Sequence, residues 1–161
     1  MDLEKKVLVG IELNFETRLI LAAAASFFRN SPAKFFILYC VQPDPVPFIN
    51  RNSKSRLNEG DIKDEMEKRI KDAGLYYLNC EIVLVHGAPA MEILDFSRKK
   101  GIDLIVLGTH QKAPVRELIT GSVSLNVVKH SICPVLLLPL KSTVKSSAEE
   151  FVKENVMATP N

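Results

Sequence analysis

The stretch Asp103-Leu104-Ile105-Val106-Leu107-Gly108 decides the fold. Its apolar side chains occupy consecutive positions, which is typical of a strand that is covered on both faces, as in a parallel sheet. Val7-Leu8-Val9-Gly10-Ile11 and Phe35-Phe36-Ile37-Leu38-Tyr39-Cys40-Val41 have the same character nearer the N-terminus. The sequence therefore predicts buried parallel strands, with Val9, Leu38, Val83, Ile105 and Val106 in their core.

Amphipathic segments alternate with these strands. After Asn14, one helical face is formed by Ile20, Ala23, Ala24, Phe27 and Phe28. A narrower apolar stripe, from about residue 56 to residue 73, contains Ile62, Met66, Ile70 and Ala73, and Gly74 is suited to end that helix. Each helix follows a strand.

The second half of the chain repeats this order. Strands are expected at 80–85, 103–108 and 134–139, and helices between Pro89 and Gly101 and from Ser122, a good N-cap, to about His130. Such alternation predicts an α/β fold with one doubly wound five-stranded parallel sheet and helices on both faces. Sheets of this kind bind ligands at the carboxyl ends of their strands, near the point where the strand order reverses.

The 161 residues are enough for one core, so we expect one domain over 1–140 and a C-terminal tail over 141–161. The segment 42–55 fits neither period and contains three prolines, which predicts a long loop. Ser147-Ala148-Glu149-Glu150 has the pattern of a capping box, which favours a short helix in the tail.

Composition argues against several classes of protein. Twenty-one basic and nineteen acidic residues leave a net charge of +2, and the basic residues are scattered, so we expect no nucleic acid partner. Cys40, Cys80 and Cys133 are odd in number and far apart, which indicates reduced thiols and no disulfide framework or zinc site. No apolar run approaches the length of about 18 residues that spans a bilayer, and the N-terminus lacks the features of a signal peptide. We therefore expect a cytoplasmic protein without a membrane partner.

Familiar catalytic patterns are missing. The chain contains no G-x-S-x-G, Walker A, H-E-x-x-H or G-x-G-x-x-G sequence, which argues against an enzyme. His86, His110 and His130 lie in separate segments without metal-ligand spacing, so no metal site is predicted. His110 alone directly follows a strand at the ligand-binding edge, and this placement by itself gives it no role.

The segment Gly108-Thr109-His110-Gln111, followed after nine residues by Gly121-Ser122, is the most informative for function. We interpret Gly108 as allowing a sharp turn off the buried strand and Gly121 as allowing close approach of the backbone. Ser122 would begin a helix whose free N–H groups favour an anion such as phosphate. Ordinary strand-to-helix turns use the same residues, so a turn without a ligand is an equally open interpretation.

Three passages resemble the universal stress protein family, in the right order from Lys6 to about Pro139. They are Val7 to Glu12, then His86-Gly87-Ala88-Pro89 leading to Asp103 to Thr109, and finally Gly121-Ser122-Val123-Ser124 running to Leu136. The resemblance implies a five-stranded sheet of order 3-2-1-4-5. It also implies a homodimer and places the chain in a family with an ATP-binding branch and a branch that does not bind ATP.

The ATP-binding branch is matched only in part. Its motif G-x2-G-x9-G-[ST] is met at Gly108, Gly121 and Ser122, but Gln111 replaces the second glycine. The family's usual Asp-Gly-Ser after the first strand is here Glu12-Leu13-Asn14. A Gln forced to φ above zero costs about 1 kcal/mol or more and fills space where phosphate would approach, so the pocket is expected to be weakened or vestigial.

The resemblance thus implies a non-enzymatic homodimeric regulator of the stress response. ATP, accompanied by magnesium, would be its cofactor if the pocket functions. Val41 corresponds to an adenine-lining residue of the family but is equally suited to the core. The residues at which a nucleotide would be expected are Glu12, Val41, Gly108, Gln111, Gly121, Ser122 and Val123.

Two other functions stay open. One is an adenine-nucleotide hydrolase or transferase, for which Glu12 and His110 are the nearby candidate groups. The other is a purely structural dimerisation module. In the implied order the last strand is an edge, so dimerisation through Val135 to Leu138 is expected. Residues 148–157 folding over the same edge would instead leave a monomer.

Overall fold

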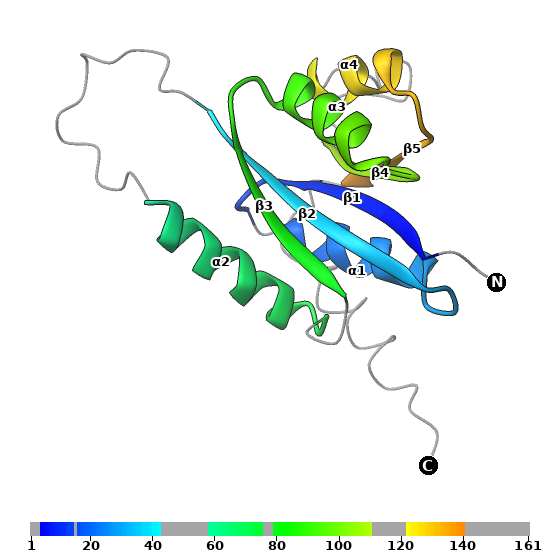
Figure 1. The fold of residues 1–161 in the computed structure, drawn as a ribbon. Helices are drawn as coiled ribbons and strands as arrows, with labels where there is room; N and C mark the ends of the chain where they lie inside the picture. The colour runs from blue at the N-terminus through cyan, green and yellow to red at the C-terminus, as the bar shows by residue number, and fades with distance from the viewer. Residues whose placement is uncertain (1–3, 15, 43–57, 76–78, 111–121, 141–161) are drawn as a thin grey trace, which may run out of the picture.

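The computed structural model describes residues 4–14, 16–42, 58–75, 79–110 and 122–140, and in them strands and helices alternate as predicted (Figure 1). The elements are β1 (Lys5–Ile11), α1 (Thr17–Phe27), β2 (Ala33–Val41), α2 (Glu59–Asp72), β3 (Cys80–His86), α3 (Pro89–Lys100), β4 (Leu104–His110), α4 (Ser122–His130) and β5 (Val135–Leu140). The predicted loop and tail lie outside the described residues. None of the described helices has the length and apolar character needed to cross a membrane.

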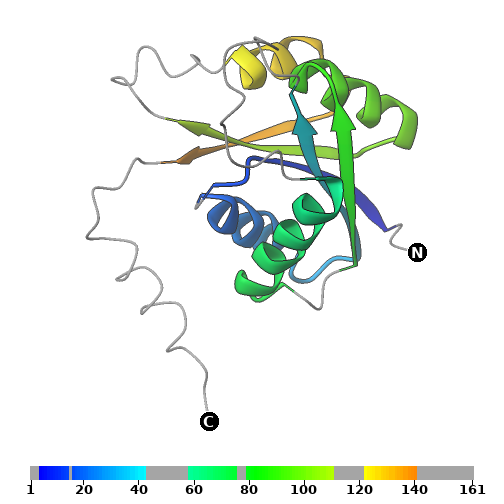
Figure 2. The same cartoon turned by 90° about the vertical axis from the view of Figure 1, so that its left-hand side faces the viewer.

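The five strands form one sheet of order β3-β2-β1-β4-β5, and all four pairings are parallel. The expected fold and strand order are therefore confirmed. Seen from the side, the arrows of β4 and β5 run across those of β2 and β3, which is the twist of an open parallel sheet (Figure 2). The strand order reverses between β1 and β4, since β2 and β3 extend the sheet on one side and β5 on the other.

Helices cover both faces of the sheet, so each central strand buries side chains in two directions (Figure 2). On β1, Val7, Val9 and Ile11 face the core beneath α1 and α2, whereas Leu8 faces the core beneath α3 and α4. Four of the five predicted core residues are almost fully buried: Val9, Leu38, Ile105 and Val106. The fifth, Val83, is half-buried because β3 is an edge strand.

The buried face of α1 differs from the prediction. Phe27 is 61% exposed, and the buried positions are Thr17, Ile20, Leu21, Ala24 and Ala25. Because helical positions recur every 3.6 residues, the next position on this face is Phe28 rather than Phe27. The Phe28 ring packs edge-on against Phe35 of β2, with 5.9 Å between ring centroids. The prediction thus placed Phe27 on the wrong face.

Both ends of α2 are fixed by local interactions. Asn58 and Asp61 form a reciprocal capping box at its start. At its end Gly74 has φ +71, and the Leu75 N–H donates to the Ile70 carbonyl at 3.0 Å, as in a Schellman motif. Gly74 therefore ends the helix as expected.

Candidate functional site

The candidate site is the carboxyl edge of β1 and β4, the two strands between which the strand order reverses. β1 leads into α1 on one face of the sheet, and α4 covers the opposite face. Glu12 follows β1 directly, and Gly10 lies opposite Leu107, so Glu12 leaves the sheet near the end of β4. This is the place at which a doubly wound sheet binds its ligands.

The other predicted site residues are distributed around this edge. Val41 is the last residue of β2. Ser122 is the first residue of α4, so it occupies the first helical position and not the N-cap position that the sequence predicted. Val41 packs against the core beneath α1 and α2, whereas Val123 packs against the core beneath α3 and α4. The two valines therefore lie on opposite faces of the sheet. Gln111 and Gly121 lie outside the described residues, so their predicted contacts with phosphate remain predictions.

Gly108 does not make the turn that the sequence suggested. It lies inside β4, opposite Leu138 of β5, and its φ is not among the positive values found at Gly74, Gly87 and Gly101. A Cβ atom at this position would stand 2.5 Å from Leu140 Cδ1 and 2.8 Å from Ile20 Cδ1. Close packing of the Leu140 and Ile20 side chains over the strand therefore favours glycine at position 108.

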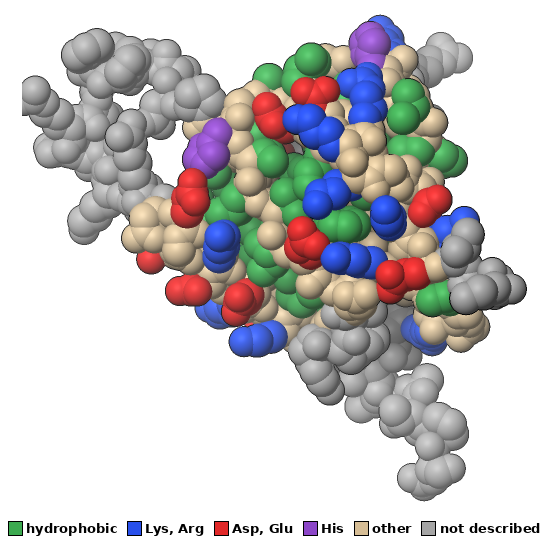
Figure 3. Space-filling view, viewed as in Figure 1, with side chains coloured by type: hydrophobic (Ala, Val, Ile, Leu, Met, Phe, Trp, Pro, Cys, Tyr) green, Lys and Arg blue, Asp and Glu red, His purple; other side chains and the backbone are tan. Residues whose placement is uncertain are grey.

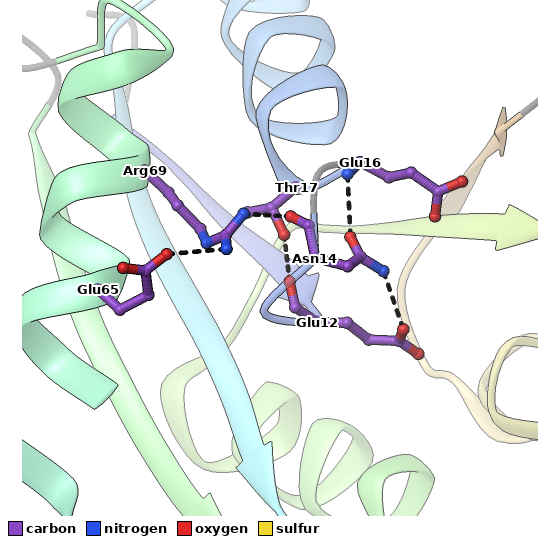
Figure 4. Close-up of polar contacts among 6 residues, drawn as sticks. All are labelled: Glu12, Asn14, Glu16, Thr17, Glu65 and Arg69. Carbon is purple, nitrogen blue, oxygen red and sulfur yellow. Dashed lines mark hydrogen bonds and ion pairs between the residues drawn. The ribbon is translucent and has the colours of Figure 1, made fainter. Parts of the chain in front are cut away.

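A polar network surrounds Glu12 (Figure 4). Asn14 Nδ2 donates to Glu12 Oε2 at 3.1 Å, and Asn14 Oδ1 accepts from the Glu16 N–H at 3.0 Å. The hydroxyl of Thr17, which is fully buried, donates to the backbone carbonyl of Glu12. Both the backbone and the carboxylate of Glu12 are thus held by neighbouring groups.

Arg69 of α2 also belongs to this network. Its Nη1 donates to the backbone carbonyl of Asn14, and its Nη2 lies 2.8 Å from Glu65 Oε1. Figure 4 shows the guanidinium reaching from α2 to the β1–α1 loop. Sequence analysis missed Arg69, and the only local signal was its spacing of four residues from Glu65, which is typical of a helical ion pair.

Leu13 and the polar face of α2 line an open hollow of about 530 Å³ beside the network. Asp61, Asp64, Glu65, Lys68 and Arg69 supply its α2 side. The hollow brings the β1–α1 loop and the middle of α2 to one surface.

The carboxyl end of β3 adds a second polar group. His86 Nε2 lies 2.9 Å from Glu59 Oε1 of α2, and the Cys40 thiol donates to the Gly87 carbonyl at 3.4 Å. Burial raises the pKa of the Cys40 thiol, and the nearby Glu92 carboxylate raises it further. His130 contacts the Asn126 carbonyl through Nδ1 at the end of α4. Within the described residues, no three of His, Cys, Asp or Glu are grouped so as to hold a metal ion.

Cys40, Cys80 and Cys133 are free and partly buried. Cys80 packs against the core beneath α1 and α2, and Cys40 and Cys133 against the other. They contribute to packing on both faces.

The model of the universal stress protein family matches residues 4–139. The universal stress protein YxiE of Bacillus subtilis is 30% identical over 145 residues, which cover 83% of this chain and 97% of YxiE.

Two solved structures have the same fold. A universal stress protein in complex with cAMP has a TM-score of 0.60 at 23% identity, and the match covers 83% of this chain and 95% of that one. The universal stress protein of Archaeoglobus fulgidus in complex with dAMP has a TM-score of 0.57 at 18% identity, with 85% and 98% of the two chains covered. These two relatives bind adenine nucleotides.

Proposed function

The chain belongs to the universal stress protein family, and from that premise we propose that it is a non-enzymatic regulator of a stress response that binds an adenine nucleotide. The observation that carries the proposal is the position of Glu12. Its carboxylate follows β1 at the strand-order reversal and is held there by Asn14. A fixed carboxylate at this edge suits the hydroxyl groups of a ribose.

The relatives solved with cAMP and dAMP support this ligand class. Both ligands combine an adenine, a sugar and a single phosphate. Gln111, at the position of a motif glycine, is expected to disfavour a longer phosphate chain by filling space near it. We therefore expect AMP or cAMP to bind at least as tightly as magnesium-ATP.

Calorimetric titration with AMP, cAMP and magnesium-ATP tests the proposal. In Glu12→Gln the affinity for AMP should fall about tenfold, since a hydrogen bond to a charged group contributes about 1.5 to 3 kcal/mol. Glu81→Gln is the matched control, because Glu81 pairs with Lys34 near the opposite ends of β3 and β2 and should leave the affinity unchanged. Gln111→Gly should tighten the binding of magnesium-ATP selectively.

Three outcomes would contradict the proposal. If none of the three nucleotides binds at about 1 mM, the proposed ligand class is excluded, since a Kd of that size corresponds to a binding free energy of only about 4 kcal/mol. Steady release of ADP or AMP from magnesium-ATP, above that of a Glu12→Gln variant, would show an enzyme. Equal affinities in the wild type and Glu12→Gln would move the site away from β1.

A further inference from the structure

Arg69 connects α2 to the loop that carries Glu12. Its side chain is 23% exposed, and two of its nitrogens are committed: Nη1 to the Asn14 carbonyl and Nη2 to Glu65 Oε1. Its Nε is buried without a hydrogen-bond partner in the described part of the chain. The guanidinium group is planar and rigid. Because its two Nη atoms contact Glu65 of the helix and Asn14 of the loop, it fixes the distance between the helix and the loop.

Asn14 carries this constraint to Glu12. The Asn14 carbonyl that receives Arg69 also accepts from the Thr17 N–H at 3.4 Å. The Asn14 side chain spans the loop, donating to Glu12 Oε2 and accepting from the Glu16 N–H. Figure 4 shows the chain of contacts running from Glu65 and Arg69 through Asn14 to the Glu12 carboxylate, which points away from α2.

A Glu side chain needs such support more than a shorter Asp would. It has one more rotatable bond, and immobilising a flexible side chain on binding costs about 0.5 to 1.5 kcal/mol. Holding the carboxylate before the ligand arrives removes part of that cost. Asn14 is suited to the task, because its amide donates to the carboxylate while its oxygen stays fixed by the backbone.

We propose that Arg69 is a positioning residue that acts through Asn14 to hold the Glu12 carboxylate in its nucleotide-binding orientation. The inference rests on the proposed function of the site. It makes α2 part of the binding apparatus, although Arg69 itself does not touch the ligand.

A double-mutant cycle tests the coupling, with AMP as the probe in calorimetric titration. Arg69→Met should weaken AMP binding about three- to tenfold in the wild-type background, which corresponds to about 0.7 to 1.4 kcal/mol. In the Glu12→Gln background the same change should have less than a twofold effect. Lys63→Met is the matched control, since Lys63 is an exposed cation on the same helix that does not line the hollow.

A second variant avoids any loss of the α2 contact. Asn14→Asp has the same shape and keeps the acceptor for the Glu16 N–H, but it replaces the donor to Glu12 with a like charge. Its loss of AMP affinity should match that of Arg69→Met, with circular dichroism unchanged. Equal effects of Arg69→Met in both backgrounds, or full affinity in Asn14→Asp, would overturn the positioning role.

Amide hydrogen exchange in the ligand-free protein separates this inference from the proposed function. The Glu16 and Thr17 amides donate to Asn14, so both should exchange about tenfold faster in Arg69→Met than in Lys63→Met. If no nucleotide binds the wild type, the proposed function fails and the exchange rates alone report whether Arg69 holds the loop. Unchanged exchange would show that it does not.

Discussion

Gly108 of β4 lies close to side chains of β5 and α1. Leu140 Cδ1 and Ile20 Cδ1 occupy the space that a Cβ atom would need. We predict that Gly108→Ala lowers the free energy of unfolding by about 1 to 3 kcal/mol, because overpacking displaces neighbouring side chains. In an Ile20→Val background, which lacks the Cδ1 atom, the cost should be smaller. Urea unfolding measures both, and equal costs in the two backgrounds would argue against the packing explanation.

This packing explains a glycine at position 108 without any reference to ligand binding. Packing in this core favours glycine at position 108 whether or not the protein binds phosphate, so the motif match there carries little information about nucleotides. Glu12 is more informative, because it follows β1 at the strand-order reversal and Asn14 donates to its carboxylate. Sequence patterns located Glu12 but not Arg69, which lies 55 residues from Asn14 and reaches the loop only in the folded chain.

The thiols of Cys40 and Cys80 should lower the free energy of unfolding at alkaline pH. Burial raises the pKa of both thiols, with a further contribution from Glu92 at Cys40 and from Glu67 at Cys80. Above a pH of about 8.5 the unfolded chain loses these protons before the folded one, so the free energy of unfolding should fall as pH rises. The Cys40→Ser/Cys80→Ser variant should show a shallower fall in denaturant titrations from pH 7 to 10. A fall of the same slope would exclude the thiols as its cause.

At the scale of the elements, the start of α2 is stabilised by a capping box. The Asp61 N–H donates to Asn58 Oδ1 at 2.9 Å, and the Asn58 N–H donates to Asp61 Oδ2 at 3.3 Å. We predict that Asn58→Ala lowers the free energy of unfolding by about 1 kcal/mol, whereas Asn58→Ser, which keeps an acceptor, costs little. Thermal unfolding followed by circular dichroism compares them. An equal loss in both variants would show that the side-chain cap is not the stabilising feature.

Strands and helices were predictable to different degrees. Continuous apolar runs located all five strands, because parallel strands are buried on both faces and their hydrophobic signal is strong. The rotation of a helix about its axis is less certain, since an error of one residue turns the assumed face by about 100°. Phe27 and Phe28 illustrate this, because only contact with Phe35 distinguishes the buried ring from the exposed one.

At the scale of the molecule, the sheet has two edge strands with different surroundings. Figure 3 shows hydrophobic side chains in the band between α2 and α3, where β3 runs, with charged residues on both sides. Most β3 residues and the four from Val135 to Leu138 are half-buried, since each strand has a neighbour on one side only. Alternation of elements predicts the architecture, but it leaves open which edge a second copy would use.

Substitutions on the two edge strands test which of them forms a dimer. We expect a homodimer through β5, because pairing two copies of Val135 to Leu138 would cover apolar side chains and unpaired backbone groups. Leu137→Lys should convert the dimer to a monomer in light scattering, where the chain mass is 18.0 kDa. Val83→Lys is the matched control, since Val83 is half-buried on the same face of the opposite edge strand and a lysine there costs similar packing.

Deleting residues 142–161 tests whether the tail, and not a second copy, covers β5. If the full-length chain is a monomer and the shortened chain a dimer, the tail covers β5 in place of a second copy. A dimer that survives the deletion and Leu137→Lys, but dissociates in Val83→Lys, would place the interface on β3. The proposed nucleotide site is at the carboxyl ends of the strands in either case, so AMP affinity should be the same in monomer and dimer unless the partner contributes to the site.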